Sequence, residues 1–194
     1  MKMNIQKELK NILNTYKINF NSVFDDKFEI KTISLANKIL NCWKKNKNIF
    51  IIGNGGSGAN AIHLANDLLY GAGFSNKKGI KIEALNSNQA VITCLSNDVG
   101  YEFIFSEQIK VKGGKGDLLI ILSGSGNSKN IIEAIKISKK MKIDTFGIIG
   151  FDGGKSKKLL DDYIHILIND MQIVEDFQMV VGHVCSKFFS RIKL

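Results

Sequence analysis

Residues 49–69 constrain the fold of this chain more than any other stretch. They begin with the apolar run Ile49 to Ile52, and a short apolar run bounded by turn residues predicts a buried strand. The glycine-rich segment Gly53 to Gly58 follows, and apolar residues then recur at helical spacing as far as Leu69. The stretch is therefore predicted to be a strand, a glycine turn and a helix. The unpaired N–H groups of such a helix start favour phosphate, although the glycines can also serve only to close the turn.

The glycine spacing alone does not identify a dinucleotide site. Glycines at 53, 55 and 58 fit the G-x-G-x-x-G pattern, but the acidic residue expected after the next strand is not clearly placed, because Glu83 falls inside that strand. The same predicted helix carries His63 and Asp67, which lie one turn apart on one face. An anion site and a titratable pair are thus expected at neighbouring levels of one helix.

Alternating strands and helices predict a single α/β domain. Parallel strands with helices between them favour a parallel sheet covered on both faces. Two amphipathic helices precede the first strand, and residues 1–45 are expected to form a helical extension that contacts another subunit or packs on its own sheet. The strands are predicted at 49–52, 80–85, 117–122, 145–149 and 163–168, and helices at 3–24, 28–43, 59–69, 90–98, 103–111, 131–140 and 175–192.

Composition narrows the class of protein. The chain has 194 residues and a net charge of +9, and this positive charge favours an anionic substrate. Its lysines are dispersed along the sequence, so we expect no nucleic-acid partner. No apolar run is long enough for a membrane span and the N-terminus lacks a signal-peptide core, so we expect no membrane partner and a cytoplasmic location. Cys42, Cys94 and Cys185 are scattered, which predicts reduced thiols that pack in the core.

A second loop repeats the logic of the first. Ser123 to Ser128 follow the buried strand at 117–122 and precede a helix, so hydroxyls and helical N–H groups are available for an anion. Taken alone, Ser125, Asn127 and Ser128 can equally be helix caps. Because the carboxyl ends of parallel strands share one edge, both loops should border one crevice, which favours a phosphorylated ligand.

Several motifs together resemble the sugar isomerase (SIS) domain family. They are GNGGS at 53–57, SNDVGYEFIFSEQI at 96–109, LSGSGNS at 122–128 and GFDGG at 150–154. Within that family the chain is similar to the phosphoheptose isomerases, which convert sedoheptulose 7-phosphate to D-glycero-D-manno-heptose 7-phosphate. The resemblance implies a flavodoxin-like, three-layer fold with a five-stranded parallel sheet, and a homotetramer with active sites between subunits. It also implies catalysis through an enediol, zinc in the active site of some relatives, and a product used in bacterial surface polysaccharides.

The same resemblance assigns roles to individual positions. It implies that His63 is a metal-site histidine and that His183 is both acid/base and metal ligand, with Asp67 and Glu175 as the other catalytic and metal-binding candidates. Asp98 matches an aspartate that lines the sugar site. The remaining implied substrate contacts are Asn54, Gly55, Gly56, Ser57, Ser123, Gly124, Ser125, Ser128 and again Glu175.

The chain departs from the family pattern at four places. Asp67 stands where a catalytic glutamate is usual, and Glu175 stands where glutamine is usual. Tyr70-Gly71-Ala72 replaces a segment that usually carries a substrate-contacting arginine, and Gly124 replaces a threonine.

We interpret two of these departures as linked. Asp67 is one methylene shorter than glutamate, and a displacement of about 1 Å can cost about 10²-fold in rate. Glu175 lies two turns before His183, so it can restore the lost reach as a base or as a ligand of a zinc site. Asp176 has a same-face spacing too and is an alternative partner, while His183 can instead be a core histidine and His165 is expected to be structural or exposed.

The sequence is also compatible with two other functions. One is a non-catalytic SIS protein, either a sugar-phosphate-sensing regulator or a partner of a replication initiator. The other is an isomerase for a different sugar phosphate, since the missing arginine at Ala72 changes the substrate contacts.

Overall fold

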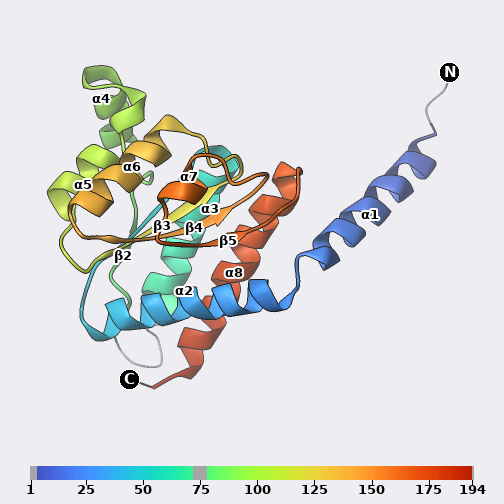
Figure 1. The fold of residues 1–194 in the computed structure, drawn as a ribbon, viewed down its shortest axis with the longest axis horizontal. Helices are drawn as coiled ribbons and strands as arrows, with labels where there is room; N and C mark the ends of the chain where they lie inside the picture. The colour runs from blue at the N-terminus through green and yellow to red at the C-terminus, as the bar shows by residue number, and fades with distance from the viewer. Residues whose placement is uncertain (1–3, 72–77, 194) are drawn as a thin grey trace.

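The computed structural model of the chain describes residues 4–71 and 78–193 (Figure 1). The strands are β1 (Ile49–Ile52), β2 (Ile82–Ala84), β3 (Leu118–Ser123), β4 (Asp144–Ile149) and β5 (Asp162–His165). The helices are α1 (Ile5–Ser22), α2 (Asp26–Lys44), α3 (Gly55–Asn66), the π-helical turn η1 (Asp67–Gly71), α4 (Gln89–Asp98), the 3₁₀ turn η3 (Tyr101–Phe103), α5 (Ser106–Lys112), α6 (Lys129–Lys140), α7 (Ser156–Leu159) and α8 (Met171–Arg191).

The strands form one parallel sheet in the order β2-β1-β3-β4-β5, which confirms the predicted flavodoxin-like fold class. The chain runs outward from β1 to β2 and then returns past β1 to β3. The strand order therefore reverses between β1 and β3, and ligands of such sheets bind outside the carboxyl ends of the strands at this point. Both predicted phosphate loops begin there.

Two separate apolar cores lie on the two faces of the sheet. Alternate strand residues such as Ile51 and Ile120 pack with α2, α3 and α8, while their neighbours, such as Phe50 and Ile121, pack with α5 and α6. Side chains alternate between the two faces along a strand, and every residue of β3 is buried. A strand that is covered on both faces therefore has a continuous apolar sequence. The result is the predicted arrangement of three layers.

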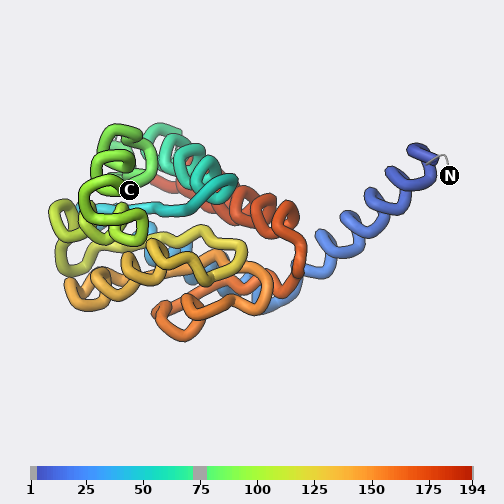
Figure 2. Tube along the Cα trace, turned by 90° about the horizontal axis from the view of Figure 1, so that it is seen from above, coloured from blue at the N-terminus to red at the C-terminus, as the bar shows by residue number. Residues whose placement is uncertain are grey.

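The two N-terminal helices behave differently. α2 buries Phe28, Leu35, Ile39 and Trp43 against the sheet, so it belongs to the domain core. α1 has no buried residue and extends away from the rest of the molecule (Figure 1; Figure 2). Of the alternatives for the N-terminal extension, α2 therefore packs on its own sheet.

Aromatic contacts connect α1 and α2 to α8. The ring of Phe177 on α8 lies 4.6 Å from Phe20, 5.2 Å from Phe24 and 5.5 Å from Phe28, measured between centroids. On the same helix Asp176 accepts a hydrogen bond from the Tyr16 hydroxyl. Burial, followed by this hydrogen bond, raises the pKa of Tyr16 to about 12.

Some predicted boundaries differ from the structure. α8 begins at Met171 and not at Glu175, because the Asp170 side chain caps its first turn by accepting from the N–H groups of Gln172 and Ile173. By contrast, the predicted end of α4 near Asp98 is confirmed. The short helix α7 was not predicted, since its four residues carry no apolar rhythm.

Two composition-based expectations have mixed outcomes. Cys42 and Cys185 are buried as predicted, whereas Cys94 is exposed on α4, so the core prediction is wrong for that cysteine. Among the described residues, no helix is both long and apolar enough to span a membrane.

We predict that Phe177→Ala lowers the free energy of unfolding by about 3–5 kcal/mol, since it empties a fully buried position between three helices. Phe188→Ala on the same helix is the control, because Phe188 is 42% exposed and should cost less than about 1 kcal/mol. Urea unfolding followed by circular dichroism measures both. Equal decreases in the free energy of unfolding would show that the contact of Phe177 with α1 and α2 stabilises the protein no more than an exposed side chain does.

Candidate active site

The first loop turns tightly from β1 into α3. A side chain at Gly53 would place its Cβ 2.4 Å from the Ser57 backbone oxygen, and Gly55 has a φ of 54°, which favours glycine. Asn54 is the N-cap residue of α3, but its side chain makes no capping hydrogen bond. The Asn54 side chain therefore leaves the N–H groups in the first turn of α3 uncapped.

The second loop rests on the segment after β4. Gly126, with a φ of 63°, accepts a hydrogen bond from the Ser156 N–H at 3.0 Å through its carbonyl oxygen. The Asn127 side-chain oxygen accepts from the Lys155 N–H at 3.0 Å. A Cβ at Gly126 would meet the Gly153 carbonyl oxygen at 2.2 Å. The glycine motif at 150–154 and the two residues after it thus pack directly against the second loop.

The two loops border one cavity of about 280 Å³ at the switch point of the sheet. Every implied substrate contact except Asp98 lines it. The lining consists of Asn54, Gly55, Gly56, Ser57, Leu122, Ser123, Gly124, Ser125, Ser128, Met171 and Glu175.

The serine hydroxyls of this cavity are arranged as donors. Ser57 Oγ accepts from the Gln178 amide at 3.0 Å, Ser123 Oγ accepts from the Gly126 N–H at 3.0 Å, and Ser125 Oγ accepts from the Asn127 N–H at 3.3 Å. A hydroxyl has one donor and two acceptor sites, so each of these serines still has its own hydrogen to donate. Ser128 makes no cap bond to α6, which argues against the simple capping alternative. A cavity of this kind suits an anion such as phosphate.

Two glycines leave room in this cavity for side chains of α8. A Cβ at Gly56 would lie 2.4 Å from a Glu175 carboxylate oxygen. A Cβ at Gly124 would lie 2.2 Å from the Met171 sulfur. The departure from threonine at position 124 therefore has a structural counterpart, because the Met171 thioether occupies the space that a side chain at 124 would need.

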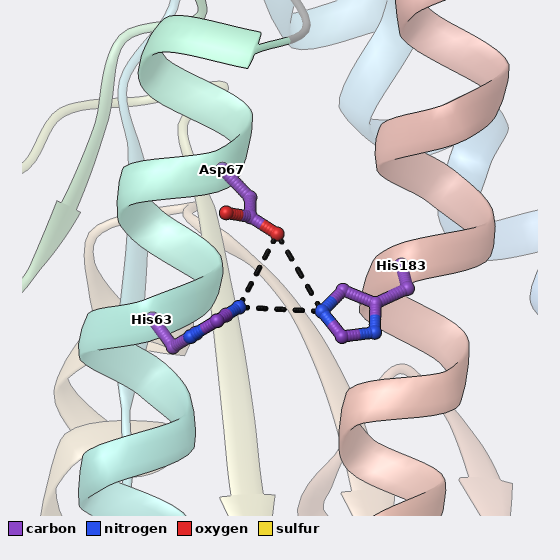
Figure 3. Close-up of side chains that lie close together, drawn as sticks. All are labelled: His63, Asp67 and His183. Carbon is purple, nitrogen blue, oxygen red and sulfur yellow. Dashed lines mark hydrogen bonds and ion pairs between the residues drawn. The ribbon is translucent and has the colours of Figure 1, made fainter.

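A second group of side chains lies further along the same pair of helices (Figure 3). His63 and Asp67 project from α3 and the start of η1, and His183 projects toward them from α8. The His63 and His183 Nε2 atoms are 3.2 Å apart, and an Asp67 carboxylate oxygen lies 3.4 Å from the first and 3.6 Å from the second. Both histidine side chains are about half exposed, so His183 is not a core histidine.

The close approach of the helices has a specific cause. Gly182 on α8 faces Leu64 on α3, and a Cβ at position 182 would lie 2.1 Å from a Leu64 methyl carbon. Glycine at this position lets α8 pack directly on α3, and its neighbour His183 is carried within reach of His63. In the described part of the chain, His63, Asp67 and His183 form the one group of this kind that could hold a metal ion.

Other predicted residues lie elsewhere. Glu175 is beside Gly56 and is not in the His–Asp–His group, and Asp176 is turned toward Tyr16 on α1. Asp98 is exposed on α4, where hydrogen bonds from Asn97 and then Cys94 lower the pKa of its carboxyl group.

The third histidine has a structural environment, as expected. His165 contacts the Phe151 carbonyl oxygen at 3.0 Å and the Lys157 ammonium group at 3.3 Å, and burial lowers its pKa. The position that usually carries an arginine, Ala72, lies outside the described residues.

Sequence reasoning missed several buried residues that position the site. Gln178 donates to Ser57 and accepts from Asn60, and Asn130 contacts Asn54. The available signal was a polar side chain inside the apolar stripe of a helix, which must find a partner when it is buried.

A larger open depression of about 1160 Å³ lies between α6 and residues 152–159, which follow β4. Lysines and acidic residues line it together, and Lys136 is paired there with Glu133 at 2.7 Å. It shares no lining residue with the cavity between the loops. We assign the chemistry to the smaller cavity, because the oriented hydroxyls are found there.

Comparison with known proteins identifies the class. A sequence profile described as "SIS domain" matches residues 22–150, which is well over half of the chain. The chain belongs to the SIS domain family.

The similar proteins define a narrower group within that family. The chain is 32% identical over 187 residues to a phosphoheptose isomerase from Fusobacterium nucleatum, covering 94% of this chain and 95% of the relative. It is 38% identical over 161 residues to a phosphoheptose isomerase from Leptospira biflexa, covering 81% and 82% of the two chains. The fold matches a phosphoheptose isomerase from Neisseria gonorrhoeae with a TM-score of 0.88 at 24% identity, covering 97% of this chain and 100% of that one.

We predict that Gly124→Thr alone destabilises the protein by about 1–3 kcal/mol, because the new side chain meets the Met171 thioether. In a Met171→Ala background the same substitution should cost much less, since the space is then free. Thermal unfolding of the four proteins of this double-mutant cycle measures the coupling. An equal cost in both backgrounds would contradict the steric pairing of Gly124 and Met171.

Proposed function

We propose that this protein is an aldose–ketose isomerase that converts sedoheptulose 7-phosphate to D-glycero-D-manno-heptose 7-phosphate in the cytoplasm. One observation carries the proposal. The donor-lined cavity and the His63–Asp67–His183 group occupy successive levels of the same α3–α8 face. The names of the relatives support the substrate.

The spacing of the two levels suits an extended substrate. Gly56 contacts Glu175 at one level and His63 contacts His183 at the other, which is a separation of two helical turns, or about 11 Å along α3. A heptose phosphate carries its phosphoryl group and its carbonyl group near opposite ends of the open chain. The cavity would bind the phosphoryl end, and this remote binding would hold the carbonyl end at the histidines.

Asp67 and His183 supply the acid/base pair. One group removes a proton from C1 of the ketose while the other protonates the C2 carbonyl oxygen, which gives the enediol. Delivery of a proton to C2 and loss of the proton from the C1 hydroxyl then give the aldose. The two groups lie 3.6 Å apart, so both can reach adjacent carbon atoms of one substrate.

The donor atoms of this group also fit a zinc ion. Ligands at about 2.0–2.1 Å in a tetrahedral site are about 3.3 Å from one another. The distances among the two Nε2 atoms and the Asp67 oxygen are 3.2, 3.4 and 3.6 Å, which is close to one face of such a tetrahedron. We therefore propose that His63, Asp67 and His183 would hold a zinc ion through one atom each, which leaves Asp67 its second carboxylate oxygen and His183 its second ring nitrogen for proton transfer. Bound zinc would polarise the substrate carbonyl group.

Histidine substitutions test the zinc assignment. His63→Ala and His183→Ala should each lose the metal, while wild type should bind about one zinc ion per chain. His165→Ala is the matched control, because this histidine contacts Phe151 and Lys157 and should leave zinc content unchanged. Zinc is measured with a chelating dye after protein unfolding. Full zinc content in both site variants would exclude the assignment.

Glu175 is proposed as a substrate-contacting group that acts beside the catalytic pair. Its carboxylate lies beside Gly56 in the cavity. Because Glu175 also lies two turns before His183 on the same helix, the experiment below tests it as a metal ligand too. Asp67→Asn should lower kcat by about 10²-fold or more, since the base is lost. Glu175→Gln should change KM and retain zinc. Loss of zinc in Glu175→Gln would instead make Glu175 a metal ligand, and unchanged turnover and zinc content would remove it from the site.

A non-catalytic role is the competing function. The assembled acid/base group supports catalysis, because a protein that only senses a sugar phosphate needs no such pair. Incubation with sedoheptulose 7-phosphate, and separately with shorter ketose phosphates, distinguishes the readings when aldose product is followed. Binding of these compounds without any product would favour a regulator, and product from a shorter ketose alone would identify a different substrate.

We also propose a homotetramer in which α1 contacts another copy of the chain. The support is the apolar stripe on a helix without buried residues, where Ile5, Leu9, Ile12 and Leu13 are each more than half exposed. Light scattering should give the mass of four 21.6 kDa chains. Leu9→Asp combined with Leu13→Asp should lower that mass, and an unchanged tetramer would place the interface elsewhere.

A further inference from the structure

Two asparagines connect the two loops of the cavity. Asn54 ends the first loop, and Asn130 lies in the first turn of α6, directly after the second loop, with only 1% of its surface exposed. Their side-chain amides donate to each other, at 2.9 Å from Asn54 to Asn130 and at 2.8 Å in the reverse direction. The loops are therefore joined by a reciprocal amide pair and not only by their common sheet.

The orientation of this pair follows from its neighbours. The Ile131 backbone N–H donates to Asn130 Oδ1 at 2.9 Å, and a backbone N–H can act only as a donor. Asn130 Oδ1 must therefore face Ile131, and its Nδ2 faces Asn54 Oδ1. The Tyr101 hydroxyl donates to the same Asn54 oxygen at 3.0 Å.

This arrangement decides what Asn54 offers to a ligand. Both acceptor sites of its Oδ1 are used, by Asn130 and Tyr101, and one N–H of its Nδ2 is used by Asn130. One N–H remains, and Asn54 lines the cavity. A flipped amide would instead present its carbonyl oxygen, which repels a phosphate.

The geometry points to Asn130 and Tyr101 as positioning residues that hold the Asn54 amide as a hydrogen-bond donor to the substrate phosphate. The inference rests on the proposed function, since it names the groups that prepare the phosphate end of that site. It also gives a role to the segment at 96–109, whose Tyr101 reaches across to the first loop. Neither residue lines the cavity itself, so both act through Asn54.

Binding of inorganic phosphate tests this inference without relying on turnover. By isothermal titration, Asn130→Ala and Tyr101→Phe should each weaken phosphate binding by about 10-fold or more, the effect of one misdirected hydrogen bond to a charged group. Tyr163→Phe is the matched control, because Tyr163 lines the separate large depression and should leave affinity unchanged. Wild-type affinity in folded Asn130→Ala and Tyr101→Phe would overturn the inference.

A double-mutant cycle separates positioning from general loss of structure. If Asn130 and Tyr101 act through Asn54, their substitutions should have no further effect on phosphate affinity in an Asn54→Ala background. Additive losses in that background would overturn the inference, and Tyr101→Phe covers the case in which Asn130→Ala unfolds. With sedoheptulose 7-phosphate, the variants should raise KM more than they lower kcat. Phosphate coupling without isomerase activity would reject the proposed reaction and retain the positioning role.

Discussion

The direct packing of α8 on α3 is the contact on which the rest of the site depends. Gly182 removes the side chain that would otherwise hold the helices apart at Leu64, and the next residue, His183, then reaches His63. One turn earlier on α8 the buried Gln178 meets Ser57 and Asn60 across the same seam. A wider helix separation would break the histidine contact and the support of the first loop together.

The polar groups around the cavity act as an oriented set. Buried amides and backbone N–H groups occupy one acceptor site on each of Ser57, Ser123 and Ser125, and Asn130 and Tyr101 occupy both acceptor sites of Asn54 Oδ1. These bonds fix the side chains before a ligand arrives, which lowers the cost of ordering them on binding. Among the described residues that line the cavity there is no lysine.

The departures from the family pattern differ in how the structure accommodates them. Gly124 is matched by Met171, which fills the space between the second loop and α8. Asp67 is shorter than glutamate, and its carboxylate oxygen still lies 3.4 Å from His63 Nε2 and 3.6 Å from His183 Nε2. Glu175 lies beside Gly56, so its carboxylate and that of Asp67 are at different levels of the α3–α8 face.

The sequence by itself determined the α/β class, the parallel sheet, the two glycine–serine loops and the pairing of His63 with Asp67, because all of these depend on local periodicity or short spacing. The partners that lie far apart in the chain were decided only by the tertiary structure. Tertiary packing turned Asp176 toward Tyr16 and joined Asn130 to Asn54, and it set the distance between His63 and His183, which the family resemblance had already assigned to one site. The physical reason is that a helix pattern shows which face is apolar, but not how closely a neighbouring helix approaches or which polar group each buried amide will meet there.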